Sequence, residues 1–239
     1  NSAIGETDWS DCDIVIEATG KHHKQAETLQ HYFEQGVKKV IVAAPTEGAL
    51  NIVYGINHHL YDANEHDLVT AASCTTNCLA PVVKVMQENI GIVHGCMTTI
   101  HDITNTQTIV DKGHKDLRRA RSATMSQIPT STGAAKAVGL VLPELNGKLD
   151  GFSMRVPTIN VSAVDLTFVA ERATSIDEIN DVLKARMERY MNVTMVIGVI
   201  SRNRVSPPKS VSEGEITLTI ANAAHHAYPI LWHDDKVQI

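Results

Sequence analysis

Short apolar runs alternate with mixed polar and apolar stretches in the first third of the chain. The run at 12–18 is followed by a segment at 21–36 that ends at a glycine, as helices often do. Two more apolar runs, at 37–45 and 67–73, are typical of strands buried on both faces. Strands that alternate with helices form parallel βαβ units. The pattern predicts a parallel sheet whose ligands lie beyond the carboxyl ends of the strands.

The pattern changes after residue 73. Apolar residues at helical spacing predict a helix that starts at residue 74, and the run 91–101 predicts a strand that ends at His101. About 30 residues without a convincing strand follow, and a loop of that length in a compact domain is usually functional. A Thr/Ser-rich turn, 130–133, then opens a second helix. Near the end of the chain, EITLTI alternates like a half-buried strand.

Composition narrows the function classes. The 239 residues are 43% hydrophobic and carry a net charge of −6 without a long basic stripe, so we expect no nucleic-acid partner. The longest apolar run near the C-terminus is far shorter than the roughly 20 residues of a membrane span, so we expect no membrane association. Four irregularly spaced cysteines favour a reducing, cytoplasmic setting and do not form a metal-site pattern. The chain begins like the interior of a longer protein.

Cys74 is the first candidate for chemistry. It lies at or just before a predicted helix N-terminus, where the helix dipole favours a thiolate. Cys78, one turn deeper among apolar neighbours, is expected to pack in the core. Because cysteine is often a buried core residue, position alone leaves Cys74 open between nucleophile and core. If the strand ending at His101 lies beside the strand that leads to Cys74, the imidazole can reach the thiol and serve as a base.

Two positions suggest anion binding. The long loop carries Arg118, Arg119 and Arg121 ahead of the turn that opens the second helix, and a helix N-terminus binds anions. A capped helix beside a solvated basic patch explains the same residues. Arg155 is a lone cation among apolar residues, and its partner could be an anion or a carboxylate.

Six ordered motifs resemble one known family. They are ASCTTNCLAPVVKV, the TTIH strand, DLRRAR, IPTSTGAAKAVG, PELNGKLDG and RVPTINVSAVDLT. In this order and spacing they closely resemble glyceraldehyde-3-phosphate dehydrogenase, from about Asp13 to about Tyr190. The resemblance implies an α/β fold with a partial Rossmann-type parallel sheet, its first half missing, and an α+β catalytic domain with a mostly antiparallel sheet. Residues 1–73 would be the remainder of the NAD-binding domain, 74–190 the catalytic domain with a long loop at 104–130, and 191–239 a divergent tail.

The resemblance also implies roles for residues. Cys74 would attack the substrate aldehyde and His101 would activate the thiol. The substrate phosphate would bind at Thr104, Arg119 and Arg155. The attacking phosphate would bind at Ser73, Thr75, Thr132 and Gly133. Thr19 and Gly20 would lie against the nicotinamide end of NAD.

The implied reaction oxidises a small phosphorylated aldehyde with NAD, as in glycolysis, and inorganic phosphate or arsenate releases the acyl group. The motif HDITNTQ favours an arsenate-linked member, with an erythrose-4-phosphate-type member as the other specialised form. The choice between NAD and NADP stays open. The family assembles as a homotetramer through the long loop. Two other hypotheses stay open, namely an inactive truncated remnant and a thiol hydrolase or acyltransferase that works without NAD.

Overall fold

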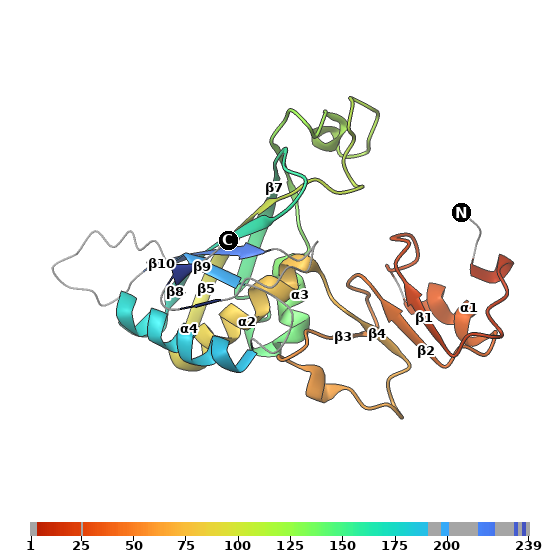
Figure 1. The fold of residues 1–239 in the computed structure, drawn as a ribbon, viewed down its shortest axis with the longest axis horizontal. Coiled ribbons are helices and arrows are strands. Elements are labelled where there is room, and N and C mark those ends of the chain that lie inside the picture. The colour runs from red at the N-terminus through yellow and green to blue at the C-terminus, as the bar shows by residue number, and fades with distance from the viewer. Residues whose placement is uncertain are drawn as a thin grey trace.

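The structure is a computed structural model. It describes residues 4–24, 26–190, 197–200, 215–222, 232–233 and 236–237, with side chains up to Arg186. No helix among these residues is long and apolar enough to cross a membrane. Besides a two-stranded sheet near the end of the chain, the described residues form two larger sheets, and each of these has its own hydrophobic core. Figure 1 shows them side by side, with the parallel sheet near the N-terminus.

The first sheet is parallel, as predicted. Its order is β1-β2-β4-β3, with bounds Ile14–Glu17, Lys39–Val42, Leu68–Thr70 and Leu50–Asn51. The predicted helix at 21–36 is much shorter, with a 3-10 turn at Ala26–Leu29 followed by α1 at Gln30–Phe33. The polar stretch Lys21–Lys24 offers no apolar face to pack, so only the part that buries Leu29 and Tyr32 is helical.

The second sheet is mixed and mostly antiparallel. Its order is β6-β7-β5-β8-β10-β9, with bounds Ile128–Ser131, Leu149–Arg155, Ile92–His101, Ser162–Ala170, Glu215–Asn222 and Ile197–Ile200. Only β5 and β7 pair in parallel. The predicted fold class, a parallel sheet plus an α+β unit with a mostly antiparallel sheet, is confirmed, and EITLTI is a strand as expected.

Three helices cover one face of this mixed sheet (Figure 1). They are α2 (Cys74–Asn89), α3 (Ala134–Val141) and α4 (Ile176–Tyr190). They share one core with the strands because each presents an apolar stripe to it, for example Leu79 and Val83 of α2 and Leu183 of α4. Smaller elements are the 3-10 turns at Ile4–Glu6, His58–Leu60, Leu117–Ala120 and Pro143–Leu145 and the short strands β11 (Trp232–His233) and β12 (Lys236–Val237).

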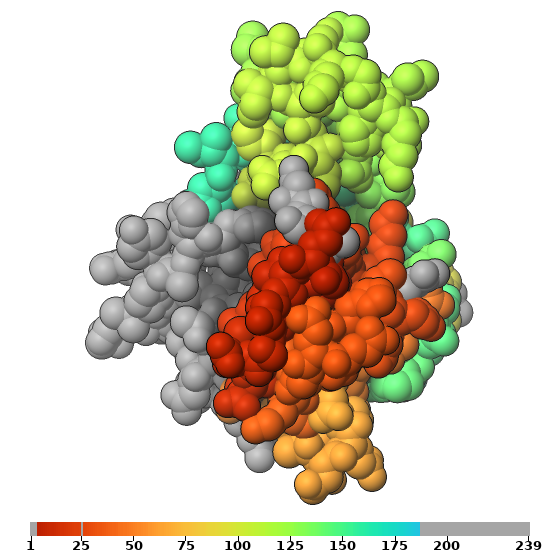
Figure 2. Space-filling view, turned by 90° about the vertical axis from the view of Figure 1, so that its right-hand side faces the viewer, coloured from red at the N-terminus to blue at the C-terminus, as the bar shows by residue number. Residues whose placement is uncertain are grey.

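The long loop projects from the end of β5 where His101 lies (Figure 1). It returns as β6, so residues 128–131 form an edge strand of the mixed sheet. The expectation that 130–133 is a turn is therefore wrong for Thr130 and Ser131, which lie within that strand. In Figure 2 the loop stands above the parallel sheet.

Candidate active site

Cys74 is the first residue of α2, as the sequence predicted. The chain leaves β4 at Thr70, turns at Ala72 with a positive φ of 53°, and enters the helix through Ser73. Ser73 is the N-cap: its Oγ accepts a hydrogen bond from the Thr76 N–H at 3.0 Å. A non-glycine residue with positive φ is uncommon, so the turn is held in place by its surroundings. The geometry fixes the Cys74 thiol beyond the end of the parallel sheet.

Cys78 packs in the core, as predicted. It is fully buried one helical turn after Cys74. Burial raises the pKa of the Cys78 thiol to about 12, and the nearby Cys74 adds to this effect. Of these two cysteines only Cys74, which is partly exposed, is suited to nucleophilic chemistry.

His101 faces Cys74. It is the last residue of β5, its side chain is 4% exposed, and its Nε2 lies 3.4 Å from Cys74 Sγ. The route by which the two residues meet differs from the expected one. β5 does not pair with β4 but belongs to the mixed sheet, between β7 and β8. The contact forms because the N-terminus of α2 packs over the end of β5. The distance suits proton transfer between a thiol and an imidazole.

Arg155 lies beside His101 as its cross-strand partner in the parallel β5–β7 pair. Its Nη1 lies 2.7 Å from His101 Nδ1, 3.1 Å from the Asp102 carbonyl oxygen and 3.5 Å from Thr104 Oγ1. Its buried Nε has no hydrogen-bond partner. Burial lowers the pKa of Arg155, and the positive charge of Arg119 lowers it further. A partly satisfied guanidinium beside a second cation fits a site for an anion.

Arg119 is the one arginine of the long loop that faces the site. Its Nε donates to Thr130 Oγ1 at 2.9 Å, and its side chain is 18% exposed. Arg118 and Arg121 form exposed ion pairs with Asp116 and Asp111. Arg119 Nε also lies 3.8 Å from Asp116 Oδ2, so it differs from the other two in its lower exposure and not in lacking an ion pair. Thr104, Arg119 and Arg155, the predicted substrate-phosphate residues, come together at the end of β5 and β7.

The predicted residues for the second phosphate lie at the N-termini of two helices that contact each other, α2 and α3. Ser73 and Thr75 are at the start of α2, where Thr75 is buried. Gly133 is the N-cap of α3, and Thr132 Oγ1 accepts a hydrogen bond from the Ala134 N–H at 3.2 Å. The capping explanation thus holds for Thr132.

Thr19 and Gly20 form the turn after β1, at the same edge of the parallel sheet as Ser73. Gly20 has a positive φ of 71°, which glycine adopts without strain. The buried Glu17 carboxylate holds this turn by accepting hydrogen bonds from Thr19 and from the Tyr32 hydroxyl. Burial alone would raise the pKa of Glu17, but these hydrogen bonds outweigh it and the pKa lies below its usual value.

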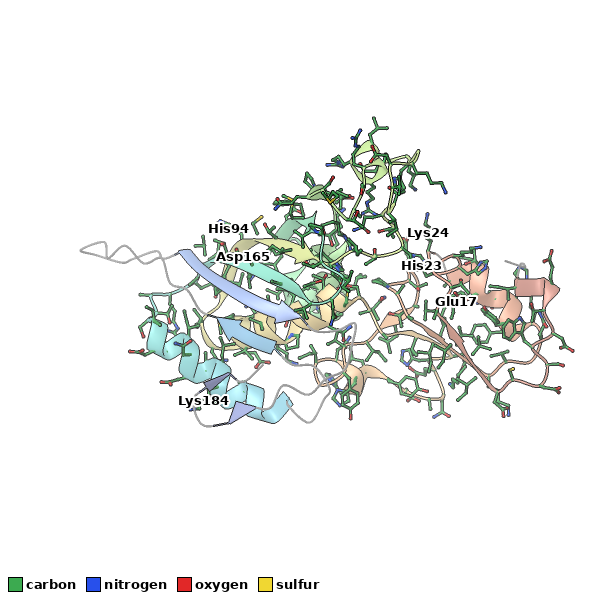
Figure 3. All side chains as sticks on the ribbon, turned by 45° about the horizontal axis from the view of Figure 1, so that its top comes forward. Glu17, His23, Lys24, His94, Asp165 and Lys184 are labelled. Carbon is green, nitrogen blue, oxygen red and sulfur yellow. The ribbon has the colours of Figure 1, made fainter. Side chains whose placement is uncertain are left out.

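A hollow of about 880 Å³ lies between this part of the chain and the long loop. Lys24 lines it from the segment after β1, and loop residues 105–115 and Arg119 line the other side. Figure 3 shows Lys24 on the side of the parallel sheet that faces the projecting loop. The volume is within the range of pockets that hold drug-sized ligands. Thr19 and Gly20 are not among the residues that line it, so the hollow and the glycine turn are separate features.

Two residues that support His101 from behind, Asp102 and Ser162, were not among the predicted site residues. The Asp102 carboxylate lies 2.7 Å from His101 Nδ1, and Ser162 hydrogen-bonds to Asp102. An acidic residue directly after the candidate base was the available signal. The acidic residue is informative only because its side chain is buried against His101. That burial depends on strand pairing and cannot be predicted from the local sequence pattern.

The fold and the site share one defining arrangement. A parallel sheet leads to a cysteine at a helix N-terminus, and this cysteine faces a buried histidine of a mostly antiparallel sheet. The model of the glyceraldehyde 3-phosphate dehydrogenase C-terminal domain matches residues 73–234. The chain is 57% identical over 237 residues to glyceraldehyde-3-phosphate dehydrogenase 3 of Nostoc sp., a match that covers 95% of this chain and 69% of that protein. The chain belongs to the glyceraldehyde-3-phosphate dehydrogenase family.

Other relatives match shorter or less similar stretches. Glyceraldehyde-3-phosphate dehydrogenase of Xanthobacter flavus is 59% identical over 180 residues, which cover 75% of this chain and 53% of that protein. The protein of the same name from Zymomonas mobilis is 48% identical over 231 residues, which cover 94% of this chain and 67% of that protein. The chain thus spans about half to two thirds of these relatives. The match to the domain model extends beyond Tyr190, to residue 234. The divergence of the tail at 191–239 stays a prediction.

Proposed function

We propose that the protein is a phosphorylating aldehyde dehydrogenase that oxidises a small phosphorylated aldehyde with NAD(P). The contact of Cys74 Sγ with His101 Nε2 at 3.4 Å, beside the partly satisfied cation Arg155, carries the proposal. A thiol and a base without an anion site would fit many thiol enzymes. The added cations favour a substrate with a phosphate group.

The reaction follows from the positions of the groups. His101 Nε2 accepts the Cys74 thiol proton, and the thiolate sulfur bonds to the aldehyde carbon. Arg155, Arg119 and Thr104 bind the substrate phosphate and so orient the carbonyl carbon toward sulfur. The His101 imidazolium returns the thiol proton to the carbonyl oxygen, which completes the hemithioacetal. The neutral imidazole then takes the hydroxyl proton as the carbon is oxidised to a thioester. An oxygen of inorganic phosphate bonds to the thioester carbon, the carbon–sulfur bond breaks, and an acyl phosphate leaves with the Cys74 thiolate restored.

A dinucleotide held by Thr19 and Gly20 would supply the acceptor for the hydride lost in the oxidation. These residues and Ser73 lie at one edge of the parallel sheet, where such sheets bind ligands. Because β2 separates β1 from β4, the two turns are about 10 Å apart. In this proposal residues 1–73 serve the dinucleotide and residues 74–190 the chemistry.

Arsenate is the alternative acyl acceptor in this proposal, because it is a tetrahedral oxyanion like phosphate. Ser73, Thr75, Thr132 and Gly133 offer hydroxyl and amide donors that suit either one. The HDITNTQ segment is the sequence feature that favours an arsenate-linked role.

A homotetramer built through the long loop is part of the proposal. Loop residues Ile109, Val110, Leu117 and Met125 are 63–84% exposed. Exposed apolar side chains on a projecting loop are typical of a contact surface. Light scattering coupled to size-exclusion chromatography would give the mass of the assembly, and a monomer at micromolar concentration would contradict this part.

The test of the function is NAD(P)H formation by the purified chain. Glyceraldehyde 3-phosphate and erythrose 4-phosphate are each supplied with NAD or NADP, and with phosphate, arsenate or neither. We expect absorbance at 340 nm to rise only with an acceptor present, and the Cys74→Ser variant to be inactive while Cys96→Ser retains activity. Hydrolysis of an activated ester without any NAD(P)H formation would instead support a thiol hydrolase, and no turnover of either kind would support an inactive remnant.

A further inference from the structure

A buried carboxylate lies on the edge of the His101 ring that faces away from Cys74. Asp102 Oδ1 is 2.7 Å from His101 Nδ1, and the two side chains are 2% and 4% exposed. On the other edge of the ring, Nε2 faces Cys74 Sγ. Thiol, imidazole and carboxylate therefore form one continuous chain. In such a chain the third group orients the base toward the nucleophile.

Asp102 is itself held by strand β8. The Ser162 hydroxyl donates to Asp102 Oδ1 at 3.1 Å and accepts from the Asp102 N–H at 3.1 Å. Both residues are buried. Val161, directly before Ser162, has a positive φ of 68°, which a β-branched residue rarely adopts. Ser162 is the first residue of β8 and pairs with Asn222 of β10, which fixes the position of its backbone.

Three groups lie within hydrogen-bond distance of His101 Nδ1, and one of them is the Asp102 carbonyl oxygen, an acceptor at 2.9 Å. Arg155 Nη1, a donor, lies 2.7 Å from Nδ1, and Asp102 Oδ1, an acceptor, lies at the same distance. If Arg155 donated to Nδ1, the proton of the neutral ring would be on Nε2, which could then not accept the thiol proton. The Asp102 carboxylate favours the proton on Nδ1 and leaves the Nε2 lone pair directed at Cys74.

The charges around the ring act in opposite directions. The cation Arg155, with Arg119 near it, opposes a positive charge on the imidazole. The Asp102 carboxylate and a Cys74 thiolate favour that charge. Without the Asp102 carboxylate, the imidazolium that forms when the thiol loses its proton would face the Arg155 guanidinium at 2.7 Å. Asp102 supplies the negative charge that offsets it.

We propose that Asp102 is a positioning residue for the base. Its carboxylate favours the Nδ1–H form of His101 together with the Asp102 carbonyl oxygen, and its negative charge stabilises the thiolate–imidazolium pair against the neighbouring Arg155. The inference deepens the proposed function, on which it rests, but it concerns the thiol pair alone and can be tested without cofactor or substrate.

The experiment is a pH titration of His101 by long-range proton–nitrogen NMR in protein labelled with ¹⁵N-histidine. The His101 signals are identified by their loss in His101→Gln. In Asp102→Asn we expect the midpoint of the His101 titration to fall by at least about one pH unit, the effect of removing an opposite charge within about 4–6 Å. Asp150→Asn removes an exposed carboxylate from neighbouring β7 and should leave the midpoint in place.

A second readout is the rate of Cys74 alkylation by iodoacetamide near pH 7. One unit in the His101 midpoint corresponds to a tenfold change in the ratio of ion pair to neutral pair, so the rate should fall by up to about tenfold in Asp102→Asn. Ser162→Ala should shift both readouts in the same direction by less, and it tests the inference even if Asp102→Asn does not fold. A purely structural role would lower the melting temperature of the variants without moving the His101 midpoint.

An unchanged His101 midpoint in folded Asp102→Asn and Ser162→Ala would overturn the inference. If the wild type still forms NAD(P)H in that case, the proposed function stands. If the midpoint shifts as expected but no NAD(P)H forms, the role of Asp102 in the thiol pair stands and the dehydrogenase function fails.

Discussion

Replacing Arg155 with methionine tests the anion site directly. Arg155 is a partly buried cation whose Nε has no partner, and Arg119 adds a second positive charge beside it. A bound phosphate group would satisfy this guanidinium. Methionine has a similar length and keeps the packing but removes the charge. We expect Arg155→Met to lose most of the response of the protein to phosphate-containing ligands.

The size of the loss follows from the contacts. A hydrogen bond to a charged group contributes about 1.5–3 kcal/mol, which corresponds to roughly ten- to a hundredfold in affinity. A phosphate ligand at 100 times its dissociation constant stabilises the wild type by about 2.7 kcal/mol. For a chain of this size that raises the melting temperature by about 5–10 °C. A thirtyfold weaker site would leave a rise of only about 2–3 °C under the same conditions.

The assay is differential scanning fluorimetry across a phosphate series, repeated with glyceraldehyde 3-phosphate. Arg118→Met is the matched control, because Arg118 is an exposed loop arginine that pairs with Asp116. It should keep the full shift. Equal shifts in Arg155→Met and in the wild type would refute the reasoning that Arg155 is held for an anion.

Three further predictions concern single residues. Iodoacetamide at pH 8 should modify Cys74 well before Cys78, since a pKa of about 12 leaves only about one Cys78 thiol in ten thousand ionised. Equal rates of modification of the two cysteines, measured by peptide mass spectrometry, would contradict this. Gly151→Ala should destabilise the protein by about 1–3 kcal/mol, because the added Cβ would clash with the Met97 carbonyl oxygen of β5. Gly113→Ala is the control, since its Cβ meets open space. Equal melting temperatures for the two variants would argue against so close an approach of β5 and β7. The pKa of Glu17 is lowered in the folded protein, so its stabilising contribution is present above the unfolded pKa of about 4.3 and is lost as pH falls through the folded pKa. The melting temperatures of the wild type and Glu17→Gln should therefore converge in acid. A constant difference between them down to about pH 2 would exclude this linkage.

The sequence predicts the local parts of the fold well. Apolar periodicity is a short-range signal. It correctly places Cys74 at or just before the start of α2 and the end of β5 at His101. It does not reveal which strands pair. The sequence pattern suggested that His101 reaches Cys74 through neighbouring strands. The strand that leads to Cys74, β4, and the strand that ends at His101, β5, belong to different sheets. The contact between the two residues depends on how a helix packs over a strand end, which is a long-range property.

The strand β6 shows a different limit. Pro129 and the hydroxyl residues around it are typical of turns, and the sequence pattern predicts one there. The segment is nevertheless a strand because it lies at the edge of the sheet, where a proline without an N–H is tolerated. Whether a strand lies at the edge or in the centre depends on the order of all strands in the sheet. The same holds for Asp102, whose significance depends on burial beneath β8.

The register of β5 and β7 has a consequence for how this site can vary in length. His101 and Arg155 are partners in the parallel ladder, so the backbone sets their separation. Inserting or deleting one residue within either strand would turn the following side chains to the opposite face and separate the base from the cation. The long loop between β5 and β6 has no such constraint. Insertions and deletions should therefore be tolerated at the tip of the loop and eliminated from the two strands.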